Sequence, residues 1–200
     1  MYTVSVLEVV SQLVSTYHQT KRYKRERNNN NNEPHYQYIG RYIHYYLEVP
    51  KVRYVSLEKK FEYLYKHNYV TEVSLKVKLK YLLENKTNNS LSSDIFLAAV
   101  IDRIELSRDR KNQVTGIRVC EVKTHSNPTN CYTNNNHRYQ VRLYGLLIYI
   151  IQHLYQEIFP NNSKLHHLIN LCFPLKAKIT LRINHLEQIM AQRAILLRQN

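Results

Sequence analysis

The middle of the chain changes from a helical period to a strand period and back, and this constrains the fold most. Apolar and polar side chains alternate in residues 72–80, which is typical of a strand with one buried face. Residues 95–104 are apolar at nearly every position, as in a strand covered on both faces, and residues 117–123 return after a polar turn. Residues 138–156 then carry an apolar stripe at helical spacing. We expect an α/β fold, a mixed central sheet flanked by helices.

Further elements are predicted on both sides of this region. By the same spacing, helices are expected over residues 4–18, 36–48, 56–67 and 184–198, and a strand over 176–182. The helix over 36–48 should end before Pro50, and Asn184 is a suitable N-cap for the last helix. Five asparagines at 28–32 indicate a loop or an insertion. The predicted order is α-loop-α-α-β-β-β-α-β-α within one domain of 200 residues.

The charge balance restricts the partners of such a domain. Lys and Arg number 29 against 15 Asp and Glu, a net charge of +14 at pH 7. A charge of this sign and size favours a polyanionic partner, most simply nucleic acid, or an acidic membrane surface. The longest apolar run, residues 146–151, is far shorter than the roughly 20 residues of a membrane-spanning helix. We therefore expect a soluble protein with no membrane partner.

The cysteines and the N-terminus indicate an intracellular protein. Cys120, Cys131 and Cys172 are odd in number and lack a Cys-Xaa-Xaa-Cys spacing, so neither a disulfide framework nor a zinc ribbon is indicated. Three scattered thiols are also too few for an iron–sulfur cluster, and none is expected. The short apolar stretch at the N-terminus is not preceded by positive charge and is a poor secretory signal. In a eukaryote we would expect a mitochondrial or nuclear location.

Three charged residues lie where the predicted strands should be apolar. Asp102 interrupts residues 95–104, and Glu121 and Lys123 lie two apart in the next strand, so both project to one face. The hairpin should bring Asp102 beside them. Two carboxylates can bind a hard divalent cation while the ammonium stabilises developing negative charge or positions water. The alternative is an ordinary buried ion pair between Lys123 and one of the carboxylates.

These residues belong to a set of motifs that resembles the PD-(D/E)XK nuclease superfamily. Residues 96–104 resemble its Gly-Xaa-Xaa-Asp motif, with Ala99 at the glycine position, and residues 118–124 resemble its Glu-Xaa-Lys strand. Gln140 and Tyr144 resemble the Gln-Xaa-Xaa-Xaa-Tyr motif that defines the RecB-like branch. Residues 40–48 resemble the early helix of that branch, whose histidine would be His44. The resemblance covers roughly residues 40–155, within a motif core of about residues 36–156, and within the branch it is greatest to the exonuclease V family.

The resemblance implies a restriction-endonuclease-like core and metal-dependent cleavage of DNA. It implies Mg²⁺ or Mn²⁺ held by His44, Asp102, Glu121 and the Val122 carbonyl, with Asp102, Glu121 and Lys123 as catalytic residues. The substrate would be single-stranded DNA degraded from an end by a monomer, as in DNA repair. Gln140 and Tyr144 would position the strand, or could simply pack the helix against the sheet. Candidate phosphate contacts are Arg138, Arg142, Lys76, Lys78 and Lys80, although a solvated charged face is the alternative for the lysines.

Two other interpretations remain open at the level of sequence. Many related nucleases hold an iron–sulfur cluster with one upstream cysteine and a closely spaced C-terminal trio, a pattern that this chain lacks. The chain would then be a cluster-free, truncated or degenerate homologue, and a catalytically inactive nucleic-acid-binding protein with the same fold is the main alternative. A basic interaction protein with accidental motif matches is the other, and it predicts no tight metal site.

Overall fold

The computed structural model describes residues 2–10, 55–78, 95–125 and 135–187. It confirms the α/β class, because five strands form one mixed sheet with helices packed against it. The strands are β1 (Tyr2–Ser5), β2 (Tyr69–Lys78), β3 (Ile95–Arg108), β4 (Val114–His125) and β5 (Lys178–Glu187). The helices with both ends described are α3 (Leu57–His67), α5 (Asn135–Ile158) and α6 (Ser163–Cys172), and residues 6–10 begin a further helix.

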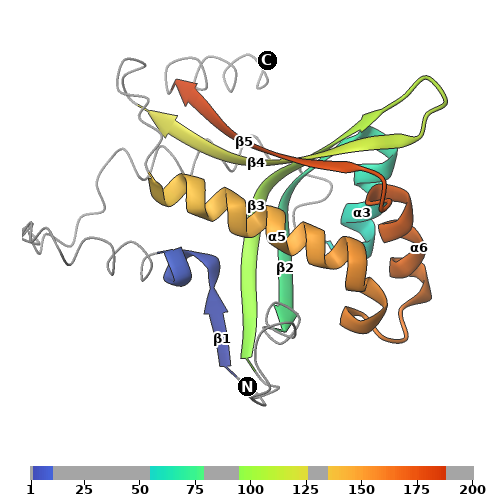
Figure 1. The fold of residues 1–200 in the computed structure, drawn as a ribbon, viewed down its shortest axis with the longest axis horizontal. Coiled ribbons are helices and arrows are strands. Elements are labelled where there is room, and N and C mark those ends of the chain that lie inside the picture. The colour runs from blue at the N-terminus through green and yellow to red at the C-terminus, as the bar shows by residue number, and fades with distance from the viewer. Residues whose placement is uncertain (1, 11–54, 79–94, 126–134, 188–200) are drawn as a thin grey trace, which may run out of the picture.

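The long strand β3 connects two parts of the sheet. Along one edge it pairs antiparallel with β2 over residues 96–105. Its other edge is shared, since β1 pairs in parallel with residues 95–98 and β4 pairs antiparallel with residues 103–108. β5 then extends the sheet in parallel with β4. Figure 1 shows the consequence: β1 to β3 run together in one half, and the end of β3 turns to follow β4 and β5 in the other.

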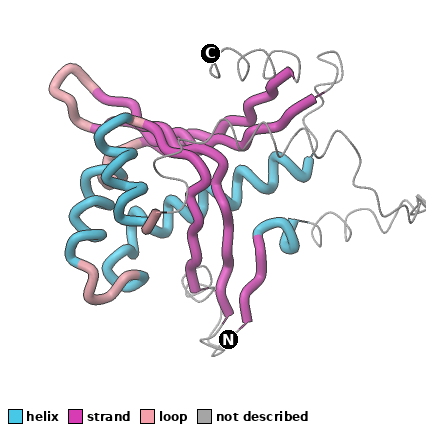
Figure 2. The backbone as a smooth tube through the Cα atoms, turned by 180° about the vertical axis from the view of Figure 1, so that it is seen from behind, coloured by secondary structure: helices cyan, strands magenta, loops and turns pink. Residues whose placement is uncertain are grey.

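The helices cover the sheet where their apolar faces meet it. α5 contacts β4 and β5 and lies across one face, with the strands in front of it when seen from behind (Figure 2). α3 and α6 pack against each other beside β2, where Phe61 and Phe173 meet edge to face at 5.1 Å between ring centroids. No helix among the described residues is long and apolar enough to cross a bilayer. The core therefore lies between the sheet and these three helices.

Most of the predicted elements are confirmed, with small changes of boundary. The structure contains the helix predicted over 56–67, with Ser56 as its N-cap, and the strands predicted over 95–104 and 117–123, both of which extend further into the hairpin. The helix predicted over 138–156 is α5, although its backbone is non-helical at Leu154. The strand predicted to start at residue 72 begins three residues earlier. The expected coverage of β3 on both faces is not observed at Val100, which is 46% exposed.

Both predictions at the ends of the described chain need correction. Residues 2–5 form a strand, because they pair with β3, and a helix begins only at Val6. Its start is a capping box in which the Ser5 N–H donates to Glu8 and the Glu8 N–H donates to Ser5 Oγ. Asn184 lies within β5 and caps no helix, since it pairs with Val122 in the ladder to β4. The predicted helix 36–48, the asparagine run and residues 188–198 lie outside the described residues.

Helix α6 was not predicted from the sequence. It begins where the Asn162 side chain accepts a hydrogen bond from the Leu165 N–H at 3.0 Å, and its buried residues include Leu165, Leu168 and Ile169. Gln152 of α5 stabilises the turn that follows α6, because its Nε2 donates to the Pro174 carbonyl at 2.6 Å. This short helix directs the chain back to the edge of β4, where β5 joins in parallel.

Candidate active site

Strands β3 and β4 separate at Asp102. Their ladder ends at the pair Arg103 and Cys120, and the next residue of β4, Glu121, pairs with Ile183 of β5. The Val122 N–H donates to Asp102 Oδ2 at 2.7 Å. The Asp102 carboxylate therefore reaches from β3 to the backbone of β4 just past the end of their ladder.

Glu121 and Lys123 project to the same face of β4, as their spacing predicts. Lys123 Nζ forms an ion pair with Glu121 Oε1. Glu121 is only 1% exposed, and its second oxygen, Oε2, is buried without a hydrogen-bond partner. Burial raises the pKa of Glu121 to about 7, as does the Asp102 charge, while Lys123 opposes the shift. The structure thus brings together the three charged residues singled out in the sequence and leaves one buried carboxylate oxygen unsatisfied.

Gln140 and Tyr144 lie one turn apart on the buried face of α5. Gln140 Nε2 donates to the Tyr144 hydroxyl oxygen at 2.6 Å, and both side chains are buried. Burial is the main cause that raises the pKa of Tyr144, and the charge of Glu121 is the next. The charges of Asp102 and Glu72 raise the pKa of Tyr144 by less, and the hydrogen bond from Gln140 lowers it. The Tyr144 hydroxyl therefore lies close enough to these carboxylates for their charge to change its pKa. Contact between this pair and a substrate remains a prediction.

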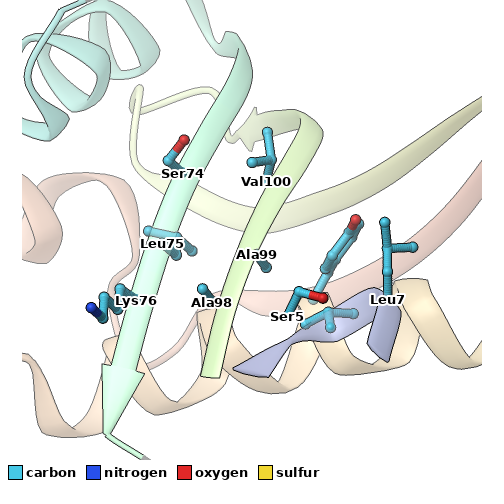
Figure 3. A pocket seen from close by; sticks show the side chains of 10 residues that line it. Ser5, Leu7, Ser74, Leu75, Lys76, Ala98, Ala99 and Val100 are labelled. Atoms are coloured by element: carbon cyan, nitrogen blue, oxygen red, sulfur yellow. The ribbon is translucent and has the colours of Figure 1, made fainter. Parts of the chain in front are cut away.

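An apolar cavity of about 430 Å³ borders Tyr144. It lies between the end of β1, the middle of β2 and residues 98–100 of β3, where β1 stops pairing with β3 (Figure 3). Ser5, Ser74 and Lys76 are the polar residues at its walls besides Tyr144. The candidate site is therefore flanked by a hollow that is mainly apolar.

The basic residues predicted to contact phosphate are on the surface where the structure describes them. Arg138 and Arg142 are exposed, one turn apart on α5. Lys76 and Lys78 place their ammonium groups over the Phe96 ring, at 4.6 and 5.7 Å from its centroid. Lys80 and the predicted metal ligand His44 lie outside the described residues.

The donor set at Asp102 and Glu121 fits a hard divalent cation in type. Both side chains offer carboxylate oxygens, the ligands that Mg²⁺ and Mn²⁺ accept, and the unsatisfied Glu121 Oε2 is a suitable donor. Within the described residues, no group of three or more His, Cys, Asp or Glu side chains is placed to hold a metal ion together. The site described here is therefore a pair of carboxylates, and a third side-chain ligand would have to come from elsewhere, as predicted for His44.

The two described cysteines are buried away from this site. Cys120 precedes Glu121 on β4, so its side chain projects to the opposite face, and burial raises its pKa to about 11. The Cys172 thiol donates to the Phe61 carbonyl at 3.4 Å, and burial raises its pKa to about 12. Both thiols are thus protonated core groups at neutral pH, and Cys131 lies outside the described residues.

Two residues near the site were missed in the sequence. Glu72 has a left-handed backbone with φ 52° in the interior of β2, opposite Asp102. Lys60 is 5% exposed on the buried face of α3, and its ammonium donates to the carbonyls of Thr71 and Glu72. The signal available for Lys60 was its position three residues after Leu57 and four before Leu64, which places it on the apolar face of the predicted helix. Nothing in the pattern of side chains signals a positive φ at a glutamate.

Comparisons with known proteins identify no family for this chain. No family profile matches it, and no curated protein matches it. A structural match is to the crystal structure of SSO0001, with 14% sequence identity and a TM-score of 0.38, covering all of this chain and 78% of that one. A similarity of this size is too low to support an inference about fold or function.

Proposed function

We propose that the chain is a divalent-metal-dependent deoxyribonuclease of the RecB-like branch of the PD-(D/E)XK superfamily, which degrades single-stranded DNA from an end as exonuclease V does. The observation that supports this most directly is the separation of β3 and β4 at Asp102, which places two carboxylates and an ammonium in one spot. An ordinary ion pair would use only Lys123 and Glu121. The nearby charge of Asp102 raises the pKa of Glu121 further. Two negative charges this close destabilise each other unless a cation binds between them.

In this proposal each residue of the site has a definite task. Asp102, Glu121, the Val122 carbonyl and His44 would hold Mg²⁺ or Mn²⁺, which would neutralise charge on the phosphodiester and make water a better nucleophile. The Val122 N–H fixes the orientation of the Asp102 carboxylate through the 2.7 Å hydrogen bond. Lys123, which is partly exposed, would stabilise negative charge developing on the reacting phosphate. Gln140 and Tyr144 would position the strand, and Arg138 and Arg142 would contact its phosphates.

The test is cleavage of single strands labelled at the 5′ or the 3′ end, with Mg²⁺, with Mn²⁺ and with EDTA. We expect end-directed degradation that requires the metal, and near-complete loss in Asp102→Asn, which keeps an acceptor for Val122 but removes the charge. Lys123→Met should lower turnover by about 100-fold or more. The matched control is Glu105→Gln, on the same strand, because Glu105 pairs with Arg103 and Arg118 instead.

The outcomes separate this proposal from its alternatives. Cleavage that persists in EDTA or in Asp102→Asn would contradict the proposed site. Binding of single strands without cleavage, in a protein that also binds Mn²⁺, would identify a catalytically inactive homologue. Absence of both DNA binding and Mn²⁺ binding would leave the ion-pair interpretation of Lys123 and Glu121.

A further inference from the structure

The apolar cavity between β1, β2 and β3 has the size and the lining of a ligand site. Its volume is about 430 Å³, and ligand pockets in proteins usually enclose about 300–1,000 Å³ with apolar walls and a few polar groups. Leu7 and Val100 at its walls are 60% and 46% exposed, so part of the wall is open to solvent. The polar groups are two hydroxyls, an ammonium and a phenol, which come from Ser5, Ser74, Lys76 and Tyr144.

The hollow arises where β1 stops following β3. β1 pairs with β3 as far as Ser5 opposite Ala98, and the chain then turns into a helix at Val6. Beyond that point β3 continues along the wall of the cavity. Figure 3 shows the short side chains of Ala98 and Ala99 between β2 and Ser5 of β1. The cavity is therefore bounded by strands of the central sheet, which give it a fixed shape.

The cavity and the candidate active site are neighbours along β3 and through Tyr144. Val100 of the cavity wall lies two residues before Asp102, which is about 7 Å along an extended strand. Tyr144 also lines the cavity, and the charges of Glu121 and Asp102 help to raise its pKa. Adjacent parts of one ligand can therefore occupy the carboxylate site and the cavity.

The chemistry of the lining favours a nucleobase as the part held in the cavity. A base has two apolar faces and an edge of hydrogen-bond donors and acceptors, which matches apolar walls with a few polar groups. The hydroxyls of Ser5 and Ser74 can donate or accept, so they suit any of the four bases. Lys76 is the charged residue among the described residues of the lining. Its positive charge suits a base acceptor or a neighbouring phosphate and disfavours a cationic ligand.

We propose that this cavity binds one base of a single strand whose neighbouring phosphate lies at Asp102 and Glu121. The base leaves the stack of its neighbours, which costs least in a single strand, and packs against Leu7 and Val100. Holding this base fixes which phosphate reaches the carboxylates, so the cavity sets the position of the cleaved bond. This role in cleavage rests on the proposed function, whereas base binding itself is testable without cleavage.

The test is an abasic scan of a very short single strand, with affinity measured by fluorescence anisotropy in EDTA so that the strand stays intact. Each strand lacks the base at one position, and the scan covers both ends. We expect the wild type to lose affinity by about 10-fold at one position near one end, because a base held by stacking contributes about this much. A scan with no loss, or with the same loss at every position, would overturn the inference.

A variant that fills the cavity checks that the effect arises there. Ala98→Leu adds bulk at a half-buried position of the cavity wall. It should weaken binding of the intact strand by about 10-fold and abolish the difference between intact and abasic strands. The matched control is Ser107→Leu, at an exposed position of the same strand outside the cavity, which should keep the wild-type profile. A wild-type profile in Ala98→Leu would overturn the inference.

A second variant covers the case in which Ala98→Leu does not fold. Leu7 is 60% exposed, so Leu7→Ala removes part of the cavity wall while leaving the core intact. It should reduce the loss of affinity at the abasic position, and an unchanged loss would overturn the inference.

The binding and cleavage assays separate this inference from the proposed function. If one base is recognised through the cavity but Mg²⁺ and Mn²⁺ give no cleavage, the proposed function fails and the base site stands. If the wild type cleaves single strands but its abasic scan is flat, the base site fails alone. A wild type that neither binds nor cleaves single strands would overturn both.

Discussion

Glu121 is the residue whose environment differs most from that of a carboxylate in water. Burial, together with the nearby charge of Asp102, raises its pKa from 4.5 to about 7, and the ion pair with Lys123 only partly offsets this. A group held in this way favours the protonated form in the native state more than in the unfolded state. Its charge is therefore a cost to the fold that a bound cation would reduce.

This shift predicts a dependence of stability on pH for the metal-free protein. Because the folded pKa exceeds the unfolded value, the native state binds the proton more tightly, and stability falls as pH rises from about 4.5 to about 7. The full loss, about 3 kcal/mol, should be present above that range. Thermal melts in EDTA at pH 5 and pH 8 measure it, and Glu121→Gln should reduce the difference between the two. A melting temperature that is higher at pH 8, and equally so in Glu121→Gln, would contradict the assignment.

At the level of elements, the sequence predicted what local patterns determine. The alternation in β2, the apolar run of β3 and the stripe of α5 each reflect one face of one element, and the structure confirms all three elements. The predictions failed where pairing decides the outcome. Residues 2–5 form a strand only because residues 95–98 offer an edge, and Asn184 is in a strand because β4 pairs with it. Neither partner can be recognised from the local sequence.

The close approach of α5 to β5 gives a prediction about Gly145. A Cβ at this position would lie 2.5 Å from Leu181 Cδ2, the end of a side chain that is 43% exposed. Alanine in a helix interior is more stable than glycine by about 1 kcal/mol. The close contact with Leu181 opposes this gain in stability. Gly145→Ala should stabilise the protein by about this amount in a Leu181→Ala background and by clearly less in the wild type. Chemical denaturation of the four variants measures the difference, and equal gains in both backgrounds would show that the helix and strand do not meet here.

At the scale of the whole molecule, the charge of +14 and the exposed arginines of α5 predict salt-sensitive binding of single strands. Each phosphate contact contributes about 0.7 to the slope of log affinity against log salt for single strands. Replacing Arg138 and Arg142 by alanine should therefore lower this slope by about 1.4 and weaken binding at low salt. Lys164→Ala is the control, since Lys164 forms an ion pair with Glu62 on the helices beside β2. Fluorescence anisotropy over a salt series measures the affinity of both variants and of the wild type. If the double arginine variant has the same salt slope as the wild type, Arg138 and Arg142 do not contact the bound strand.

The candidate site was predictable only in part for the same reason. A hairpin and a spacing of two residues are enough to bring Asp102, Glu121 and Lys123 together, and the structure shows them in contact range. The separation of β3 from β4, the positive φ of Glu72 and the buried donor of Lys60 depend on how three elements meet. Such features arise from tertiary packing, which overrides local preferences.

The parallel pairing of β4 with β5 has a consequence for how the molecule folds. Beyond Cys120, the described ladder of β4 is with β5, and the described link to β3 is the hydrogen bond from the Val122 N–H to Asp102. β5 follows β4 only after α5 and α6, and such long-range closure is slow because chain entropy is lost before contacts form. The hairpin of β3 and β4 can form early, whereas its reactive end should become ordered among the last steps of folding. During synthesis, the candidate nuclease centre would then remain unassembled until the rest of the sheet is in place.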